Sequence, residues 1–312
     1  MLACASVREC HSTKSSTWLG KRSPDKVESL SEVGELLAAY DAQLRGHLHD
    51  RLPDSLRVER DGPLVRTLRL GKRGFVEYRD LAGLDGEELD TLIARQVQVF
   101  ARHGEPFEWK LHGHDRPADL PDRLRAAGLV PEDTETVVIG PVEVIAGEPS
   151  LPEGVVIREL REPGDFARLV QLDESMSHED HRWIDTLADE RAADPQGLSI
   201  FVAETGGRTV CDGWVRFPSG TEFATFWGGF TLPAWRGRGL YRALVAHRAK
   251  LATERGRRYI QVDASDASRP ILERLGFVAV TTTTPYVWSP SPPGAEVNAD
   301  DGSAGTGSRN AP

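Results

Sequence analysis

The stretch LPAWRGRGLYRALVAHRAKLATERG, Leu232–Gly256, joins a strand-like segment to a long helical pattern through an Arg-Gly-Arg-Gly turn. The pattern predicts a helix from about Arg238 to Arg255, with Gly256 where a helix commonly ends. Backbone N–H groups at a helix start have no intrahelical partner and carry partial positive charge, and glycine lets an anion approach them. Arginines there oppose the helix dipole, and a bound anion would offset that cost. The turn is therefore either an exposed basic turn or a cradle for a phosphate group.

The composition is that of a globular protein with an acidic balance. The 312 residues predict two domains of ordinary size. The net charge of -10 argues against nucleic acid as a partner. The sequence contains no run of about 18 apolar residues, so we expect no membrane span. Cys4, Cys10 and Cys211 are too scattered for a disulfide framework or a metal-binding motif. These features predict a cytoplasmic protein that binds neither nucleic acid nor membranes.

The two ends differ in composition from the rest of the chain. Residues 1–25 are basic and rich in Ser and Thr, lack the apolar core of a signal peptide, and are predicted to be a disordered leader. Residues 289–312 contain no aromatic side chain and are rich in Pro, Gly, Ala and Asp, which predicts a disordered tail. Between them we expect domains at 26–142 and 155–288, with a linker at 143–154.

The hydrophobic pattern of residues 155–288 predicts an α/β fold. The order of elements is β, one or two helices, three strands, and then α, β, α, β, which favours a central twisted mixed sheet flanked by helices. Gly228 and Gly229 interrupt the long strand Thr221–Leu232, and paired glycines inside a strand indicate a bulge or a close backbone approach. The predicted strands are Val155–Leu160, Leu198–Glu204, Arg208–Pro218, Thr221–Leu232, Arg258–Ser265 and Thr281–Trp288.

The first block repeats the second half of this order. It predicts strands at Val76–Leu81 and Phe107–Gly113, and a helix at Asp85–Gly104. Its segment RLRAAGLVPEDTETVVI, residues 123–139, echoes ILERLGFVAVTTTTPYVW, residues 271–288. This indicates an internal duplication, with chance similarity as the alternative. The polar residues of KLHGHD, residues 110–115, are interpreted as surface groups at a strand end.

Three segments of the second block stand in one order: GGFTLPAWRGRGLYRALVAHRAKLATERG, QVDAS and PILERLGF. Together they resemble the GNAT family of acetyl-coenzyme A-dependent N-acetyltransferases. The resemblance covers about residues 155–288 and implies the GNAT fold and acetyl-coenzyme A as co-substrate. In that family the turn amides hold the pyrophosphate and the bulged strand pairs with the pantetheine arm. The coenzyme-binding residues would then be Gly229, Phe230, Thr231, Arg236, Gly237, Arg238, Gly239, Leu240, Tyr241 and Ser268.

The first block lacks such a turn. Its corresponding loop, RDLAGLDGEELD, places acidic residues at a helix start, where they suit the dipole but repel a pyrophosphate. We therefore expect a degenerate GNAT-like half without a coenzyme site. It would serve as a scaffold or as one wall of the acceptor pocket.

Several positions depart from the family pattern. Tyr241 stands where the family prefers Gly or Ala, Leu272 where many members have a tyrosine acid, and Gln261 where one branch has a glutamate base. Ser268 or Asp266 would replace an asparagine. Neither the usual acid nor that base is therefore present.

An amine acceptor must still lose a proton, and the leaving thiolate must be neutralised. Glu222 and His178 are the leading candidate bases, since His titrates near neutrality, and Tyr286 is the candidate acid. Other candidate bases in the same helical region are Asp173, Glu174, Asp180 and His181. The alternatives are a solvated helix face for the bases and a core position for Tyr286. His178 and His181 have the spacing of a metal pair, but no third ligand accompanies them, so we expect no metal.

The leading hypothesis is an N-acetyltransferase that moves an acetyl group from acetyl-coenzyme A to a primary amine of a small molecule or peptide. The alternative is an acyl-coenzyme A-binding or ligand-sensing module with little catalysis, because the usual acid and base are missing. A third is a structural protein in which the fold only mediates association. We expect a monomer or a homodimer.

Overall fold

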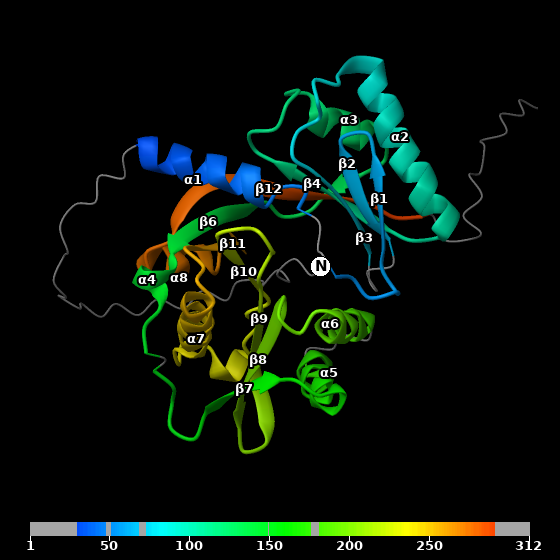
Figure 1. Cartoon of the computed structure of the whole chain (residues 1–312). Coiled ribbons are helices and arrows are strands. Elements are labelled where there is room, and N and C mark those ends of the chain that lie inside the picture. Colours follow the sequence, from blue (N-terminus) through cyan, green and yellow to red (C-terminus); the bar gives the residue numbers. More distant parts are fainter. Residues whose placement is uncertain (1–29, 48–50, 69–72, 149, 176–180, 291–312) are drawn as a thin grey trace, which may run out of the picture.

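A computed structural model describes residues 30–47, 51–68, 73–148, 150–175 and 181–290 (Figure 1). The predicted leader and the tail beyond residue 290 lie outside the described residues. The described strands form a single mixed sheet in the order β1-β2-β3-β4-β12-β6-β11-β10-β9-β8-β7, with β5 beside β12. The strands are β1 (Arg57–Asp61), β2 (Leu64–Leu68), β3 (Gly74–Tyr78), β4 (Phe107–His112), β5 (Val130–Pro131), β6 (Glu135–Pro141), β7 (Val156–Leu160), β8 (Leu198–Thr205), β9 (Arg208–Arg216), β10 (Phe223–Trp227), β11 (Tyr259–Ala264) and β12 (Val278–Trp288).

Helices lie on both faces of this sheet, which confirms the predicted fold class. The helices are α1 (Leu30–Gln43), α2 (Gly86–His103), α3 (Leu120–Ala126), α4 (Val142–Ile145), α5 (Ala167–Glu174), α6 (Arg182–Ala193), α7 (Leu240–Glu254) and α8 (Arg269–Arg274). Two 3-10 turns, at Pro163–Phe166 and Pro233–Trp235, accompany them. None of the described helices combines the length and the apolar character that a bilayer crossing requires.

The two halves exchange their last strands. β6, from the first half, pairs with β11 of the second, and β12, from the second half, pairs with β4 of the first. β6 and β12 also pair with each other in antiparallel orientation at the centre of the sheet. Residues 143–154 therefore do not connect two separate sheets. The strands of the first half include β12 of the second half, and the strands of the second half include β6 of the first.

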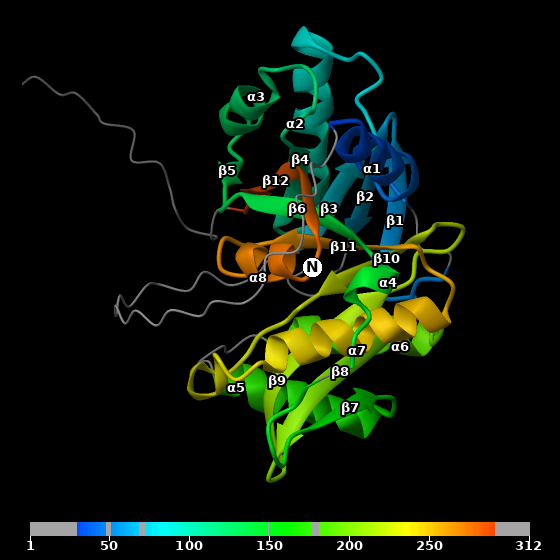
Figure 2. The same ribbon diagram turned by 90° about the vertical axis from the view of Figure 1, so that its left-hand side faces the viewer.

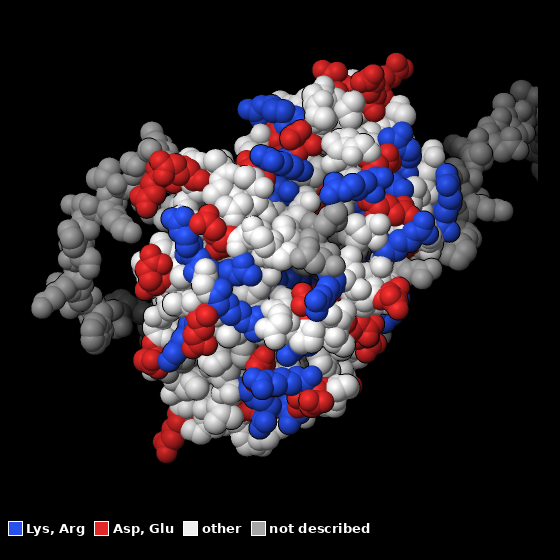
Figure 3. All heavy atoms as spheres, viewed as in Figure 1, with Lys and Arg blue, Asp and Glu red and all other residues white. Residues whose placement is uncertain are grey.

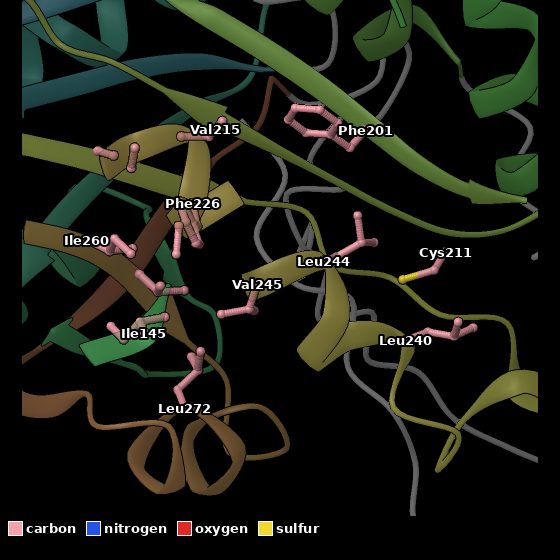
Figure 4. Packing of buried hydrophobic residues seen from close by; sticks show 14 of the residues in the cluster. Ile145, Phe201, Cys211, Val215, Phe226, Leu240, Leu244, Val245, Ile260 and Leu272 are labelled. Carbon is pink, nitrogen blue, oxygen red and sulfur yellow. The ribbon is translucent and has the colours of Figure 1, made fainter. Parts of the chain in front are cut away.

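Alternation of side chains along the strands assigns the helices to faces. α4, α7 and α8 bury one face of the second half in the largest apolar cluster (Figure 2), and Figure 4 shows Leu244 and Val245 of α7 in that cluster with Phe226 and Ile260 of the sheet. α5 and α6 cover the other face around Trp214. α2 and α3 cover the first half, and α1 lies across the centre, against strands of both halves.

Local signals set the helix bounds well. α7 runs within the predicted helix, and α2 ends before Gly104, whose left-handed φ of 63° provides the C-cap. Asp85, where the predicted helix begins, is the N-cap residue of α2, although its side chain makes no capping hydrogen bond. α1 and the hairpin β1–β2 had no counterpart in the sequence analysis. α1 has one small apolar face and β1 contains no buried residue, so neither gives a strong periodic pattern.

Candidate active site

The Arg-Gly turn has the geometry of an anion cradle. Gly237 and Gly239 adopt left-handed φ values of 74° and 85°, and α7 begins directly after them without a side-chain cap. The backbone N–H groups of Gly237, Arg238, Gly239 and Leu240 donate to no residue in the described part of the chain. No atom lies within 4 Å of the position that a Cβ on Gly237 would take. The turn thus presents unpaired donors in open space at a helix start.

Two exposed arginines lie beside these donors. The Nε of Arg236 donates to the carbonyl oxygen of Thr231 at 3.1 Å, and its guanidinium lies 5.8 Å from the ring centroid of Phe230. The guanidinium of Arg238 lies 4.6 Å from the ring centroid of Trp235. Aromatic surfaces therefore support both guanidinium groups. Together with the free amides, they form a site whose charge and geometry suit a diphosphate.

The strand before the turn contains the predicted bulge. Trp227 pairs with Trp214, whereas Thr231 pairs with Cys211, so the β10 side has one residue more than the β9 side. Gly229, in this extra turn of backbone, has a φ of 99°. The bulge redirects the chain toward the cradle.

A buried carboxylate holds the bulge from below. Asp212 Oδ1 accepts the backbone N–H groups of Gly229 and Phe230 at 3.3 and 2.8 Å. Burial raises the pKa of Asp212 to about 6, because desolvation outweighs these hydrogen bonds.

Arg248 of α7, 1% exposed, donates to the carbonyl oxygens of Trp214 and Trp227, both at 3.0 Å. Burial lowers the pKa of this guanidinium. One helix side chain thus fixes two strands at the point where the bulge begins.

Tyr241 faces the bulge. A Cβ on Gly229 would lie 2.6 Å from Cε2 of Tyr241, so the ring packs against this glycine. The departure from a small residue at position 241 is therefore matched by a glycine opposite it. The ring fills the space under the bulged strand instead of the space in front of the turn amides.

The other predicted site residues lie elsewhere. Glu222 is at the end of β10 remote from the turn, where it forms a 2.6 Å ion pair with Arg258 that lowers the pKa of its carboxyl, and accepts a hydrogen bond from Gln43. Tyr286 is buried in the apolar cluster of the first half, because β12 crosses to β4. His178 lies outside the described residues.

Two further positions named in the sequence analysis, Ser268 and Leu272, lie at the start of α8 and within it. Ser268 is the residue before α8, and its amide donates to the carbonyl oxygen of Ser265. Leu272, at the position of the family acid, belongs to α8 and is fully buried in the apolar core. The described residues contain no group of three or more His, Cys, Asp or Glu side chains that could hold a metal ion.

A second feature, which we call the inter-half pocket, lies on the sheet face opposite α7. It has a volume of about 70 Å³, which is room for several water molecules or a small polar group. Trp227, directly before the bulge, lies in its wall, and the first half supplies the opposite wall. The lining residues are Tyr40, Leu44, Arg45, Gly46, His47, Glu77, Tyr78, Lys110, His112, Arg216, Pro218, Thr225, Trp227, Gln261 and Asp263.

The sequence analysis did not find this pocket. Its residues come from the end of α1 and from strands of both halves, so no single segment contains its pattern. The segment KLHGHD did mark His112, but as a surface group, whereas His112 is 5% exposed and its Nε2 lies 2.9 Å from the hydroxyl of Tyr40. Only the exchange of strands between the halves brings these groups together.

Comparisons with known proteins agree with this geometry. Residues 174–287 match the family model of the acetyltransferase (GNAT) domain. A search of curated proteins by sequence returned no match. Among solved structures, a GCN5-related N-acetyltransferase from Kribbella flavida is 17% identical with a TM-score of 0.56, and the match covers 83% of this chain and 95% of that one.

Two further solved structures extend the similarity to both halves. A tandem GNAT protein from the clavulanic acid biosynthesis pathway is 16% identical with a TM-score of 0.53, covering 77% of this chain and 85% of that one. A GCN5-related N-acetyltransferase from Sphaerobacter thermophilus is 14% identical with a TM-score of 0.54, covering 74% and 78%. At these identities the structures show a shared fold. Residues 174–287, in the second half of this chain, are thus similar to the acetyltransferase (GNAT) domain, and the solved structures agree with it in fold.

Proposed function

We propose that the protein transfers an acetyl group from acetyl-coenzyme A to a primary amine of a small molecule or peptide. The observation that carries this proposal is the bulged strand followed by four unpaired turn amides at the start of α7. A diphosphate is the coenzyme group that needs such donors, and Arg236 and Arg238 add the charge that a diphosphate requires.

The turn and the bulge would have different parts in binding. The amides of Gly237 to Leu240 would hold the diphosphate. The amides of Gly229 and Phe230 already donate to Asp212, so these residues would contribute the shape of the bulge. The pantetheine arm would follow this strand toward Trp227, and the thioester would then lie near the inter-half pocket, from which the amine would approach.

Calorimetry with acetyl-coenzyme A tests the coenzyme site. In Arg236→Ala/Arg238→Ala we expect the dissociation constant to rise about tenfold or more, because two charge-assisted contacts are lost. Arg60→Ala/Arg102→Ala is the matched control, since it removes two exposed arginines of the first half and should change the constant by less than about twofold. A wild-type protein that binds no acetyl-coenzyme A, or a turn variant that binds it equally well, would contradict the proposal.

One observation favours the second candidate, an acyl-coenzyme A-binding module with little turnover. Leu272 is fully buried, so no acid stands at the family's position beside the departing sulfur. Thiol release measured against a panel of primary amines separates the two candidates. Release above the rate of hydrolysis with any amine supports the transferase, and binding without release supports the module.

A further inference from the structure

We propose that Glu77, on β3 of the first half, binds the acceptor amine and takes its proton. The half without a coenzyme turn would then complete the active site of the other half. This inference rests on the proposed function and names a residue for its acceptor side. The acceptor class that it implies is a small primary amine, bound as an ammonium ion in the inter-half pocket.

The position of Glu77 follows from the sheet. β3 and β4 are parallel neighbours, and alternate side chains of both strands point away from α2. Glu77 and Lys110 therefore face the inter-half pocket, whereas Trp109 points into the apolar cluster beneath α2. On the opposite wall, Trp227 belongs to the strand that enters the bulge. The pocket thus connects Glu77 with the strand end at which the thioester is expected.

Within the described ranges of the chain, Glu77 differs from the other charged groups of the pocket in having no partner. Lys110 forms an ion pair with Asp263. The guanidinium of Arg45 contacts Asp115 at 2.5 Å, and that of Arg216 is paired with Glu190. Among the described residues, Glu77 alone of these lining charges has neither a hydrogen bond nor an ion pair. Glu77 lines the pocket and the residue as a whole is partly exposed, so a ligand in the pocket can reach it.

Two buried polar atoms indicate that the pocket takes a polar ligand. In the part of the chain that the structure describes, Nη1 of Arg216 and Nδ1 of His112 have no hydrogen-bond partner, although the two residues are 6% and 5% exposed and both line the pocket. The nearest carboxylate oxygen to His112 Nδ1, Oδ2 of Asp115, is 3.8 Å away. Unsatisfied buried polar atoms are costly, so a native fold that retains them commonly provides a partner. An amine with a polar substituent would supply one, whereas an apolar ligand would not.

The charge environment favours proton uptake by Glu77. Burial raises the pKa of Glu77 to about 7, with Glu108 and Asp263 adding to the rise and Lys110 opposing it. A carboxylate of this basicity accepts a proton from an ammonium ion more readily than an ordinary glutamate does. Burial also lowers the pKa of His112, which favours its neutral form. The titratable and charged groups around the pocket are Tyr40, Arg45 and His47 from α1 and the segment after it, Tyr78 from β3, Glu108, Lys110 and His112 from β4, Arg216 from β9 and Asp263 from β11.

The proposed acetyl transfer to the amine conserves atoms and charge. Glu77 takes one proton from the ammonium ion, and the freed lone pair of nitrogen forms a bond to the thioester carbonyl carbon. The carbon–sulfur bond breaks, and its electron pair stays on sulfur. The second proton lost by nitrogen neutralises that thiolate, and Glu77 returns the first proton to water. The products are an amide, a free thiol and one proton.

Amine turnover by Glu77→Gln tests the inference. We expect kcat/KM for the amine to fall about 100-fold or more, because the proton acceptor is lost while the volume is retained. In the wild type, kcat/KM should rise with pH through about 7, since the carboxylate must be unprotonated. This rise should be absent from the profile of Glu77→Gln. Glu77→Asp should retain more activity than Glu77→Gln and should keep a titration in this range.

Binding measurements separate this inference from the proposed function. Acetyl-coenzyme A should bind Glu77→Gln with the wild-type constant, and thermal unfolding should show that the variant is folded. Glu87→Gln, an exposed glutamate at the start of α2, is the matched control and should leave kcat/KM unchanged. If the wild type fails to bind acetyl-coenzyme A, the proposed function fails. A Glu77→Gln variant that binds it but keeps the wild-type kcat/KM and pH profile would overturn the assignment of Glu77, and so would one that loses coenzyme affinity.

Acidic and basic side chains are interspersed on the face of the molecule drawn in Figure 3, so no large field of one sign directs the acceptor there. Selection of a cationic amine would therefore depend on Glu77, the carboxylate of the pocket that has no partner among the described residues. Competition between a primary amine and its neutral N-acetyl product checks this point. The amine should bind the wild type at least about tenfold more tightly than the product does, and Glu77→Gln should remove the difference. Equal binding of the two compounds to the wild type would also overturn the assignment.

Discussion

At the scale of single residues, the bulge depends on the absence of one side chain. Gly229 has a φ of 99°, a conformation that L side chains rarely adopt, and the ring of Tyr241 occupies the space that a Cβ would need. Two independent requirements thus act on one position. The sequence alone identified the glycine as a mark of a bulge, but it gave no indication of what the tyrosine contacts.

Gly229→Ala should therefore destabilise the protein by about 2 kcal/mol or more, because backbone strain and a steric clash add together. Urea denaturation measures the effect. Gly237→Ala is the control. Gly237 has a similar φ of 74°, but nothing lies within 4 Å of an added Cβ, so only the loss from backbone strain, about 1 kcal/mol, should remain. Gly229→Ala/Tyr241→Ala should recover part of the loss. Equal losses at Gly229 and Gly237 would show that the ring does not restrict the bulge.

At the scale of elements, α7 joins the Arg-Gly turn to the sheet through Arg248. This side chain is buried under the strand ends, where it donates to two carbonyl oxygens and lies 4.5 Å from the ring centroid of Phe226. The apolar pattern of the helix predicted its bounds, because Leu240, Leu244 and Val245 recur on one face. A charged residue on that face contradicts the pattern, and only the orphan carbonyls of the bulged strand explain it.

Arg248→Leu should lower the free energy of unfolding by about 3 to 5 kcal/mol, since buried carbonyl groups and the carboxylate of Asp212 lose their cationic neighbour. Chemical denaturation again provides the measurement. Arg242→Leu, at an exposed position of the same helix, should change stability by less than about 0.5 kcal/mol. A similar small effect at Arg248 would mean that the strand ends do not need this donor.

At the scale of the whole molecule, the exchange of β6 and β12 makes each half depend on the other. Local patterns predicted most strands and helices, because alternation and helix periodicity act within short segments. The partners of a strand cannot be obtained in this way. β12 has the same pattern whether it pairs within its own half or with β4, and the pairing depends on long-range packing. For this reason the sequence analysis located the Arg-Gly turn, but it kept Tyr286 as a candidate acid with a core position as the alternative, and it did not identify the inter-half pocket.

Fragments 1–150 and 151–312 should each fail to fold alone, because β4 and β11 would lack the strands that pair with them. Mixed together they should regain the circular dichroism spectrum of the intact chain. A protease site inserted after residue 150 is the control, since cleavage of the folded protein should leave both pieces associated on gel filtration. A fragment that unfolds cooperatively alone would show that its half does not need the exchanged strand.

The central place of β12 also has a consequence for synthesis. β4 and β6 leave the ribosome early, but β12, the strand that lies between them, begins 137 residues after β6 ends (from residue 141 to residue 278). At typical translation rates roughly 7 to 30 s pass between the synthesis of β6 and that of β12. During that time the edges of β4 and β6 that later pair with β12 have no partner strand, and unpaired sheet edges are prone to pair with other chains. The nascent protein is therefore most exposed to aggregation just before its own last strand arrives, and a chaperone that shields strand edges would have most effect in that interval.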